Sequence, residues 1–316
     1  MSLQKVSVAE AKGNIVRNCP GTKHHICCGY KTIDLIEGCV MACSYCILNA
    51  YINTPCIKIN RDTPYIISQI GHTIDNDETD HILRFGTGEL SDSLALDRKL
   101  GLNRPLVEFF GEKKKALLEL KSKWAYITHL APYLNPYTVI SFSLAPQRII
   151  DKEEKRTSPL YKRLRMAKKA QELGCFVGLH FDPIIIYEGF EKDYEYLIED
   201  IGRILDLKKV IWLSMGLLRF PPKLFDRFIE ERRKNLLYGE FIRGEDGKYR
   251  YIKQERIRVY RMLYNLLKNK EEELFIYLCM EREDVWQKVT GLTVRDNEAL
   301  IGLFDNRIKK IFGGNI

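Results

Sequence analysis

The chain has 316 residues, of which 45% are hydrophobic and 29% are charged, and this composition excludes a disordered or fibrous protein. No stretch reaches the about 18 uninterrupted apolar residues of a membrane span, and residues 1–14 lack the apolar core of a signal peptide, so we expect a cytoplasmic protein with no membrane partner. The net charge of +8 favours a polyanionic or acidic partner.

Short β-rich runs alternate along the chain with longer amphipathic runs. We expect strands at 31–37, 81–86, 116–123, 138–144, 175–185, 209–215 and 273–280, and helices at 103–116, 160–173, 191–206 and 254–268. This alternation predicts parallel strands joined by right-handed crossovers, hence a barrel or partial barrel with functional residues at the C-terminal ends of its strands. Residues 1–30 are expected to form an N-terminal extension and 31–218 the barrel. Residues 219–316 are expected to form an insertion or lid and a C-terminal α/β segment that completes the same domain.

Three cysteines, Cys39, Cys43 and Cys46, follow the first predicted strand directly, and a helix is expected from Ile47. Their spacing differs from the paired CxxC motifs of zinc ribbons and suits an iron–sulfur cluster. Zinc binding and unrelated buried cysteines are the alternatives to a cluster. Three thiolates can bind three irons of a 4Fe–4S cluster and leave the fourth iron without a protein ligand, whereas electron-carrier clusters usually take four cysteines. An open iron can chelate S-adenosylmethionine (SAM), which one electron then cleaves to methionine and a 5′-deoxyadenosyl radical.

The CxxxCxxC spacing is the signature of the radical SAM family, which this chain resembles. The resemblance implies that Tyr45 packs near the adenine of SAM, with an ordinary core aromatic as the alternative. Thr87-Gly88-Glu89 follows the second predicted strand and resembles the family's glycine-glycine-glutamate motif. Glu89 is then expected to accept charge-assisted hydrogen bonds from the methionine ammonium, while Gly88 lets the backbone approach the ligand.

Further SAM contacts are expected at the ends of the following strands. Lys123 would suit the methionine carboxylate, with a solvated lysine as the alternative. Ser141 and Ser143 alternate along the fourth strand and offer hydroxyls to SAM, unless they only fill the strand. His180 and Asp182 end the fifth strand on one face, where they would meet the substrate or the SAM ribose, although a hydrogen-bonded core histidine is an equal interpretation for His180.

From about Gly29 to Leu218 the sequence resembles the spore photoproduct lyase family more closely. The matching segments are SYCILNAYI (44–52), RFGTGELSD (84–92), SFSLAPQRIIDKEEKRTSPLYKRL (141–164) and GCFVGLHFDPIIIYEGFEKDY (174–194). These radical SAM enzymes reverse a methylene-bridged thymine dimer in DNA. The resemblance implies a partial (β/α)6-type TIM barrel, a 4Fe–4S cluster, SAM, a DNA substrate, and an electron donor such as flavodoxin or ferredoxin. It also places Ser91 and Arg163 among the cofactor-binding residues.

Two departures from that family concern the hydrogen atom that ends the reaction. In the lyases a cysteine after the second strand returns hydrogen to the product radical, but Glu89 occupies that position here. A tyrosine that follows the last cluster cysteine in the lyases is replaced by Ile47. The candidate hydrogen donors are Cys279, Tyr277 and Tyr187, each with a packing role as its alternative. A radical SAM enzyme acting on a peptide or small metabolite is therefore the second hypothesis, and an iron–sulfur electron carrier is the third.

The N-terminal extension and the arginines raise separate questions. Cys19, Cys27 and Cys28 lie near two histidines in residues 18–30, but they lack a CxxC pair. We expect them to pack against the barrel rather than to bind a second metal. Because the guanidinium group suits bidentate anion recognition, the leading phosphate or carboxylate contacts are Arg148, Arg163 and Arg219.

Overall fold

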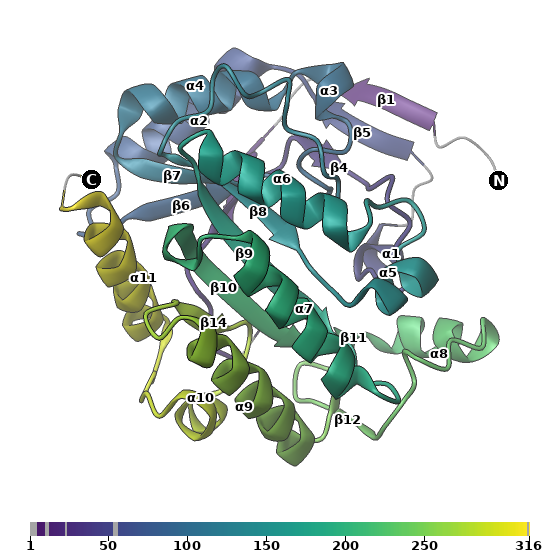
Figure 1. Cartoon of the computed structure of the whole chain (residues 1–316). Helices are drawn as coiled ribbons and strands as arrows, with labels where there is room; N and C mark the ends of the chain where they lie inside the picture. Colours follow the sequence, from purple (N-terminus) through teal and green to yellow (C-terminus); the bar gives the residue numbers. More distant parts are fainter. Residues whose placement is uncertain (1–4, 10–12, 23, 53–55, 315) are drawn as a thin grey trace.

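The fold is known from a computed structural model that describes residues 5–9, 13–22, 24–52, 56–314 and 316. Its centre is an eight-stranded sheet with strand order β14-β10-β9-β8-β7-β6-β3-β2, curled into a half barrel (Figure 1). The strands β3 (Lys31–Ile33), β6 (Leu83–Gly86), β7 (Ala116–Ser122), β8 (Thr138–Ser143), β9 (Phe176–Ile184), β10 (Val210–Leu217) and β14 (Ile276–Leu278) are parallel. The edge strand β2 (Val16–Asn18) is antiparallel to β3. The predicted partial barrel is confirmed.

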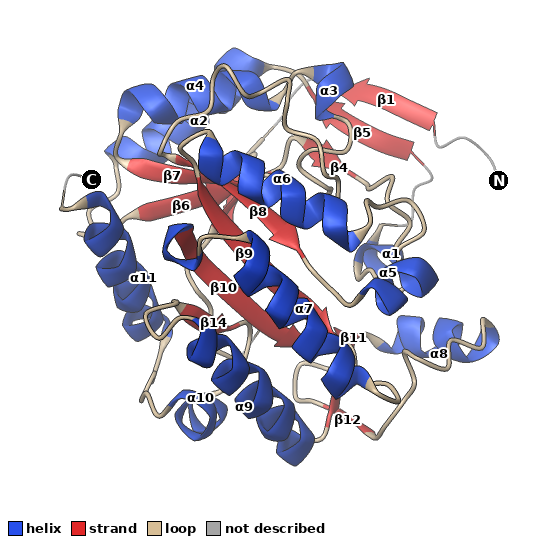
Figure 2. Cartoon of the chain, in the orientation of Figure 1, coloured by secondary structure: helices blue, strands red, loops and turns tan. Residues whose placement is uncertain are grey.

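Helices cover the outer face of this sheet (Figure 2). They are α2 (Thr63–Asp75), α4 (Asn103–Lys113), α6 (Leu160–Glu172), α7 (Phe190–Ile204), α9 (Lys253–Lys270) and α10 (Glu283–Thr290). The last helix, α11 (Asn297–Phe312), lies instead at the N-terminal ends of β6 and β10, where its Phe304 ring packs on the inward-facing Trp212. Shorter helices are α1 (Leu48–Tyr51), α3 (Asp97–Leu100), α5 (Gln147–Glu153), α8 (Pro222–Glu230) and the 3₁₀ helix Leu207–Lys209. No helix in the described part of the chain is long and apolar enough to cross a lipid bilayer.

Side-chain alternation along the strands separates the core from the barrel interior. In β7, Leu118 and Leu120 are fully buried in the apolar core, whereas Glu119 hydrogen-bonds to side chains of β8, β9 and β10. Because successive side chains of a strand point to opposite faces, Lys121 shares the inner face with Glu119. The helices thus cover an apolar face, and the interior of the half barrel is polar.

The prediction of a single strand over 31–37 is wrong, because this range forms two separate strands. The chain turns after β3, where the Leu35 N–H donates to the Ile33 carbonyl oxygen (2.9 Å). Residues Ile36–Glu37 then form β4, which belongs to a separate small sheet with β5 (Cys56–Asn60) and β1 (Lys5–Ala9). The helix expected from Ile47 is the single turn α1. Residues 219–253 form α8 and a third sheet of β11 (Arg219–Phe220), β13 (Tyr249–Tyr251) and β12 (Phe241–Arg243).

The N-terminal segment 19–30 connects the two edges of the half barrel. It leads from the edge strand β2 into β3, and at the opposite edge Ile26 forms an antiparallel bridge with Glu281, just after β14 (N···O 3.0 Å). The Cys27 N–H donates to the Asn297 side chain at the start of α11 (2.7 Å), and Arg84 donates to the Cys28 carbonyl oxygen. The backbone at Cys27 and Cys28 is therefore hydrogen-bonded to α11 and β6.

Candidate active site

The three predicted cluster cysteines lie on the loop after β4. Gly38, with φ +106°, turns the chain into this loop, and its N–H donates to the Leu90 carbonyl oxygen (3.0 Å). Cys43 forms an antiparallel bridge with Glu154, which follows α5, and its carbonyl oxygen accepts from the Asn49 side chain (2.9 Å). The loop is thereby fixed to segments that follow β6 and β8, at the C-terminal end of the barrel.

The donor set on this loop fits an iron–sulfur cluster. The thiols of Cys39, Cys43 and Cys46 form no disulfide. Burial raises the pKa of Cys39 to about 12, and it raises the pKa of Cys43 and of Cys46 above the ordinary value. Thiolates in such dry surroundings need a cationic partner. No three Cys, His, Asp or Glu side chains in the described ranges converge as the ligands of one metal ion do. Three separate thiolates are the ligands that three irons of a cluster would take.

The Glu154 carboxylate contacts three of the predicted SAM-site residues beside the cysteine loop. The Tyr45 hydroxyl and the Arg163 guanidinium donate to its carboxylate, and Lys123 Nζ lies 2.9 Å from Oε1. Burial alone would raise the pKa of the Glu154 carboxyl, but the cations Lys123 and Arg163 lower it to about 2. The structure thus brings Tyr45, Lys123 and Arg163 together, with Lys123 paired to a carboxylate that the sequence did not assign to it.

Glu89 lies on the loop after β6 and forms an ion pair with Lys121 of β7 (2.6 Å). Burial would lower the pKa of Lys121, but the carboxylates of Glu89 and Glu119 raise it above its ordinary value. A Cβ on Gly88 would lie 3.1 Å from the Lys121 Cβ and 3.2 Å from Ser93 Oγ, so this loop needs glycine to approach β7. The sequence analysis did not assign Lys121 to the site. Its position two residues before Lys123 was a usable signal, because it places both side chains on the same face.

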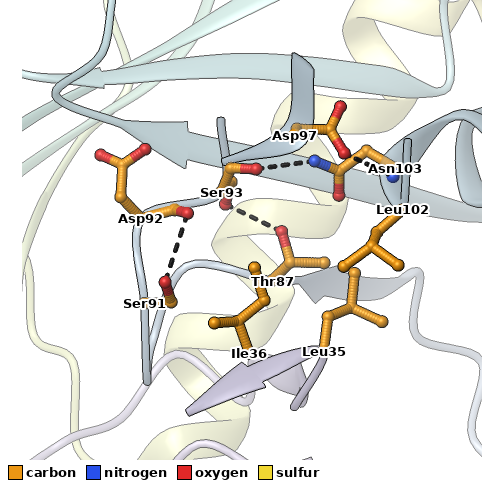
Figure 3. A pocket seen from close by; sticks show the side chains of 9 residues that line it. All are labelled: Leu35, Ile36, Thr87, Ser91, Asp92, Ser93, Asp97, Leu102 and Asn103. Carbon is orange, nitrogen blue, oxygen red and sulfur yellow. Dashed lines mark hydrogen bonds between the residues drawn. The ribbon is translucent and has the colours of Figure 1, made fainter. Parts of the chain in front are cut away.

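Asp92 holds the Glu89 loop against the end of β7. Its carboxylate accepts from the Lys123 N–H (2.7 Å) and from the Ser122 hydroxyl (2.7 Å). Thr87 donates to Ser93 (2.8 Å), and both line a cavity of only about 10 Å³, enough for about one water (Figure 3). The hydroxyl of the buried Ser91 lies 3.5 Å from the Asp92 carbonyl oxygen. The Thr87 hydroxyl therefore stabilises the loop.

A buried hydrogen-bond network centred on Glu119 lies inside the half barrel. Glu119 accepts from the Ser141 hydroxyl and the Trp212 indole (2.9 Å), and it lies 2.8 Å from His180 Nε2. The other ring nitrogen of His180 lies 2.7 Å from Ser214 Oγ. Burial opposes ionisation of Glu119, but His180 lowers its pKa to about 2. Ser141 and His180, predicted as cofactor contacts, are thus hydrogen-bonded to Glu119 inside the barrel, and Glu119 is a central residue that the sequence analysis missed.

Cys279 lies at the opening of the barrel, just after β14. Arg219 NH2 lies 3.5 Å from its Sγ and 3.2 Å from the Asp182 carboxylate. Burial raises the pKa of the Cys279 thiol well above its ordinary value, despite the opposing effect of Arg219. Tyr277 precedes it on the same face of β14 and is buried. Two of the three candidate hydrogen donors therefore lie in the interior.

Two strand-end candidates remain, Tyr187 and Ser143, and only Tyr187 points away from the barrel interior. Tyr187, the third candidate donor, donates its hydroxyl to Asp193 of α7 (2.9 Å), and the Arg148 guanidinium lies over its ring. It therefore contacts the helical layer. The Ser143 carbonyl oxygen accepts from Arg163 (2.7 Å), and the Ser143 side chain is nearly buried on the same strand face as Ser141.

A family model described as spore photoproduct lyase matches residues 27–271, which include the cysteine loop and every strand of the barrel from β3 to β10. The chain belongs to the spore photoproduct lyase family. It is 31% identical to a spore photoproduct lyase of Clostridium acetobutylicum over 169 residues, 53% of this chain and 50% of that protein. It is 27% identical to the spore photoproduct lyase of Bacillus subtilis over 238 residues, 71% of this chain and 68% of that protein.

Solved structures show the same fold. A spore photoproduct lyase complexed with dinucleoside spore photoproduct has a TM-score of 0.73 and 22% identity, over 86% of this chain and 82% of the other. The S-adenosylmethionine-bound SuiB of Streptococcus suis has a TM-score of 0.50 and 13% identity, over 83% of this chain and 52% of the other. The family match therefore agrees with the resemblance read from the cysteine spacing and the strand ends.

Proposed function

We propose that this member of the spore photoproduct lyase family is a radical SAM enzyme that acts on a pyrimidine photoproduct or another base of DNA. The observation that carries the proposal is the cysteine loop, which presents three thiols and no fourth at the C-terminal end of the barrel. The names of the relatives and the dinucleoside photoproduct bound to a protein of the same fold support the choice of substrate. The net charge of +8 supports a polyanion.

The loop residues Cys39, Cys43 and Cys46 would hold the cluster. When reduced and bound to SAM, the cluster supplies a 5′-deoxyadenosyl radical that abstracts hydrogen from the substrate. Glu89 is the residue that we expect to bind the methionine ammonium, and Lys123 is the residue that we expect to bind the methionine carboxylate. Glu89 now pairs with Lys121 and Lys123 with Glu154, so binding of the methionine group would exchange one ion pair for another at each residue.

Cys279 is our leading candidate for the hydrogen donor. A hydrogen-atom donor must carry its proton, and burial keeps the pKa of this thiol high. In the step, the S–H bond breaks, a C–H bond forms at the product radical, and a thiyl radical remains on Cys279. Arg219 fixes the sulfur at the opening of the barrel, where the product radical would form. Replacing Cys279 with alanine should leave 5′-deoxyadenosine formation intact while the yield of repaired thymines falls.

The deciding experiment measures 5′-deoxyadenosine from anaerobically reconstituted protein with SAM and dithionite, with and without DNA that contains spore photoproduct. Stimulation by this DNA, coupled to the appearance of thymines, supports lesion repair. Slow cleavage that no DNA stimulates would instead favour the second function, radical modification of a peptide or small metabolite. The altered hydrogen-donor position at Glu89 is the observation that keeps this second function open.

A further inference from the structure

A second cavity, of about 220 Å³, lies between α8 and the hairpin of β12 and β13. It is lined by Phe225, Leu237, Gly239, Phe241 and Tyr249. The rings of Phe225 and Tyr249 stack with their centroids 4.7 Å apart, and Gly239, at φ +92°, contributes no side chain to the wall. Pockets for drug-sized ligands are larger, roughly 300–1,000 Å³. This aromatic pocket therefore suits a single flat ring.

The segment that builds the aromatic pocket is strongly basic. Residues 219–253 contain ten Lys and Arg against six Asp and Glu, so this segment carries +4 of the chain's net charge of +8. Arg232, Lys234 and Arg243 are exposed, and the described residues offer none of them a carboxylate partner. Arg243 lies opposite Tyr249 in the β12–β13 ladder, so the two side chains share the face of the hairpin that lines the pocket.

The aromatic pocket also adjoins the candidate active site. Arg219 contacts Asp182 and Cys279 at the opening of the barrel. The next residue, Phe220, packs on the other side of the same small sheet, with its ring centroid 5.2 Å from that of Phe241. Successive residues of a strand point to opposite faces. One strand therefore separates the aromatic pocket from the barrel interior.

We propose that the aromatic pocket binds an unstacked nucleobase of the substrate strand, next to the nucleotide that enters the barrel. Every base has an aromatic face, and stacking on protein rings holds single-stranded nucleic acid without sequence preference. Arg243 contacts the adjoining phosphate, since it lies on the pocket face and donates there to the Gly247 carbonyl oxygen (3.3 Å) but to no carboxylate of the described residues. This inference rests on the proposed function, because it takes the substrate to be a nucleic-acid strand.

The test compares two fluorescein-labelled strands of equal length and charge, an oligothymidylate and a strand of abasic sites, bound to the full chain and followed by fluorescence anisotropy. Tyr249→Leu removes the aromatic face but keeps an apolar side chain. We expect it to weaken oligothymidylate binding on the order of tenfold, the usual effect of losing one base–aromatic stack, and to leave abasic binding unchanged. The matched control is Tyr196→Leu on α7, an exposed tyrosine outside this segment, which should change neither affinity.

A second variant tests the proposal without removing a ring, in case Tyr249→Leu misfolds the hairpin locally. Arg243→Gln leaves every ring in place, and it should weaken both strands equally and reduce the slope of log affinity against log salt by about one. Equal effects of Tyr249→Leu on both strands, or no effect on either, would overturn the proposal, as would an unchanged salt slope for Arg243→Gln. Failure of photoproduct DNA to stimulate SAM cleavage would refute the proposed function alone, because these binding measurements need neither cluster nor SAM.

Discussion

The buried carboxylate of Glu119 should stabilise the folded barrel, and Glu119→Gln is the substitution that tests this. In the native protein the Glu119 pKa is about 2, against an ordinary value of 4.5, because His180 and the neighbouring donors favour the ionised form. At about 1.36 kcal/mol per pKa unit, this difference corresponds to roughly 3 kcal/mol of stability at neutral pH. Leaving buried hydrogen-bond donors without their acceptor independently predicts a loss of about 1–3 kcal/mol for each such donor.

The same shift predicts the pH dependence. A carboxyl whose folded pKa is depressed contributes its full stability above the unfolded value of 4.5 and loses it as the pH falls toward 2. Urea unfolding at pH 7 should therefore show Glu119→Gln to be less stable by roughly 3 kcal/mol. Between pH 5 and pH 2, the variant should lose less stability than the native protein.

The matched control for this experiment is Glu273→Gln, which removes an exposed carboxylate paired with Lys310. It should leave the unfolding transition unchanged, since exposed ion pairs contribute little. The reasoning would be refuted if Glu119→Gln were within about 1 kcal/mol of the native protein at pH 7 and showed the same acid dependence. The random error of such unfolding measurements is smaller than the predicted loss of stability.

Three further predictions concern the cluster, SAM and the C-terminal helix. Cys43→Ala should abolish SAM cleavage, and retained 5′-deoxyadenosine formation would contradict the cluster assignment. Glu89→Ala should weaken SAM binding in a calorimetric titration while the visible spectrum of the cluster stays the same; unchanged SAM affinity would contradict its role. The His81 pKa is raised by hydrogen bonds to Asp305 and Glu298 of α11, so its contribution is present below the ordinary His pKa and lost as the pH rises through the folded value. His81→Gln should therefore lower stability at acidic pH but not at alkaline pH, and an equal loss at both would argue against this pairing.

The parallel strands could be predicted from the sequence because each is apolar over most of its length and is bounded by polar residues. β10 illustrates this, since all eight of its residues are buried. The division of 31–37 into two strands was not predictable, because the turn at Leu35 depends on which sheet each half joins. The helix α11 was missed despite usable signals, namely Asp296, whose side chain accepts from the Ala299 N–H, and Gly313 in a left-handed conformation at its end.

For the candidate site, the residue types were predictable but their partners were not. The Lys123–Glu154 and Glu89–Lys121 pairs join residues about thirty positions apart, and only the crossover connections bring them together. Glu119 differs from these, because an acidic residue inside an apolar strand run already indicates an inward-facing polar group. The partner of Tyr187 was equally unpredictable, because its hydroxyl donates to Asp193 of α7.

The bridge between Ile26 and Glu281 has a consequence for how the chain folds. These residues lie near opposite ends of the sequence, so their contact has one of the largest sequence separations in the molecule. Contacts of this kind form late, because a long loop must close before they can stabilise anything. During synthesis the central strands can pair as they leave the ribosome, but the side of the barrel stays open until α11 has been made. Until then Cys27 and Cys28 lack their final neighbours, so oxidative damage to these thiols should be greatest in the nascent chain.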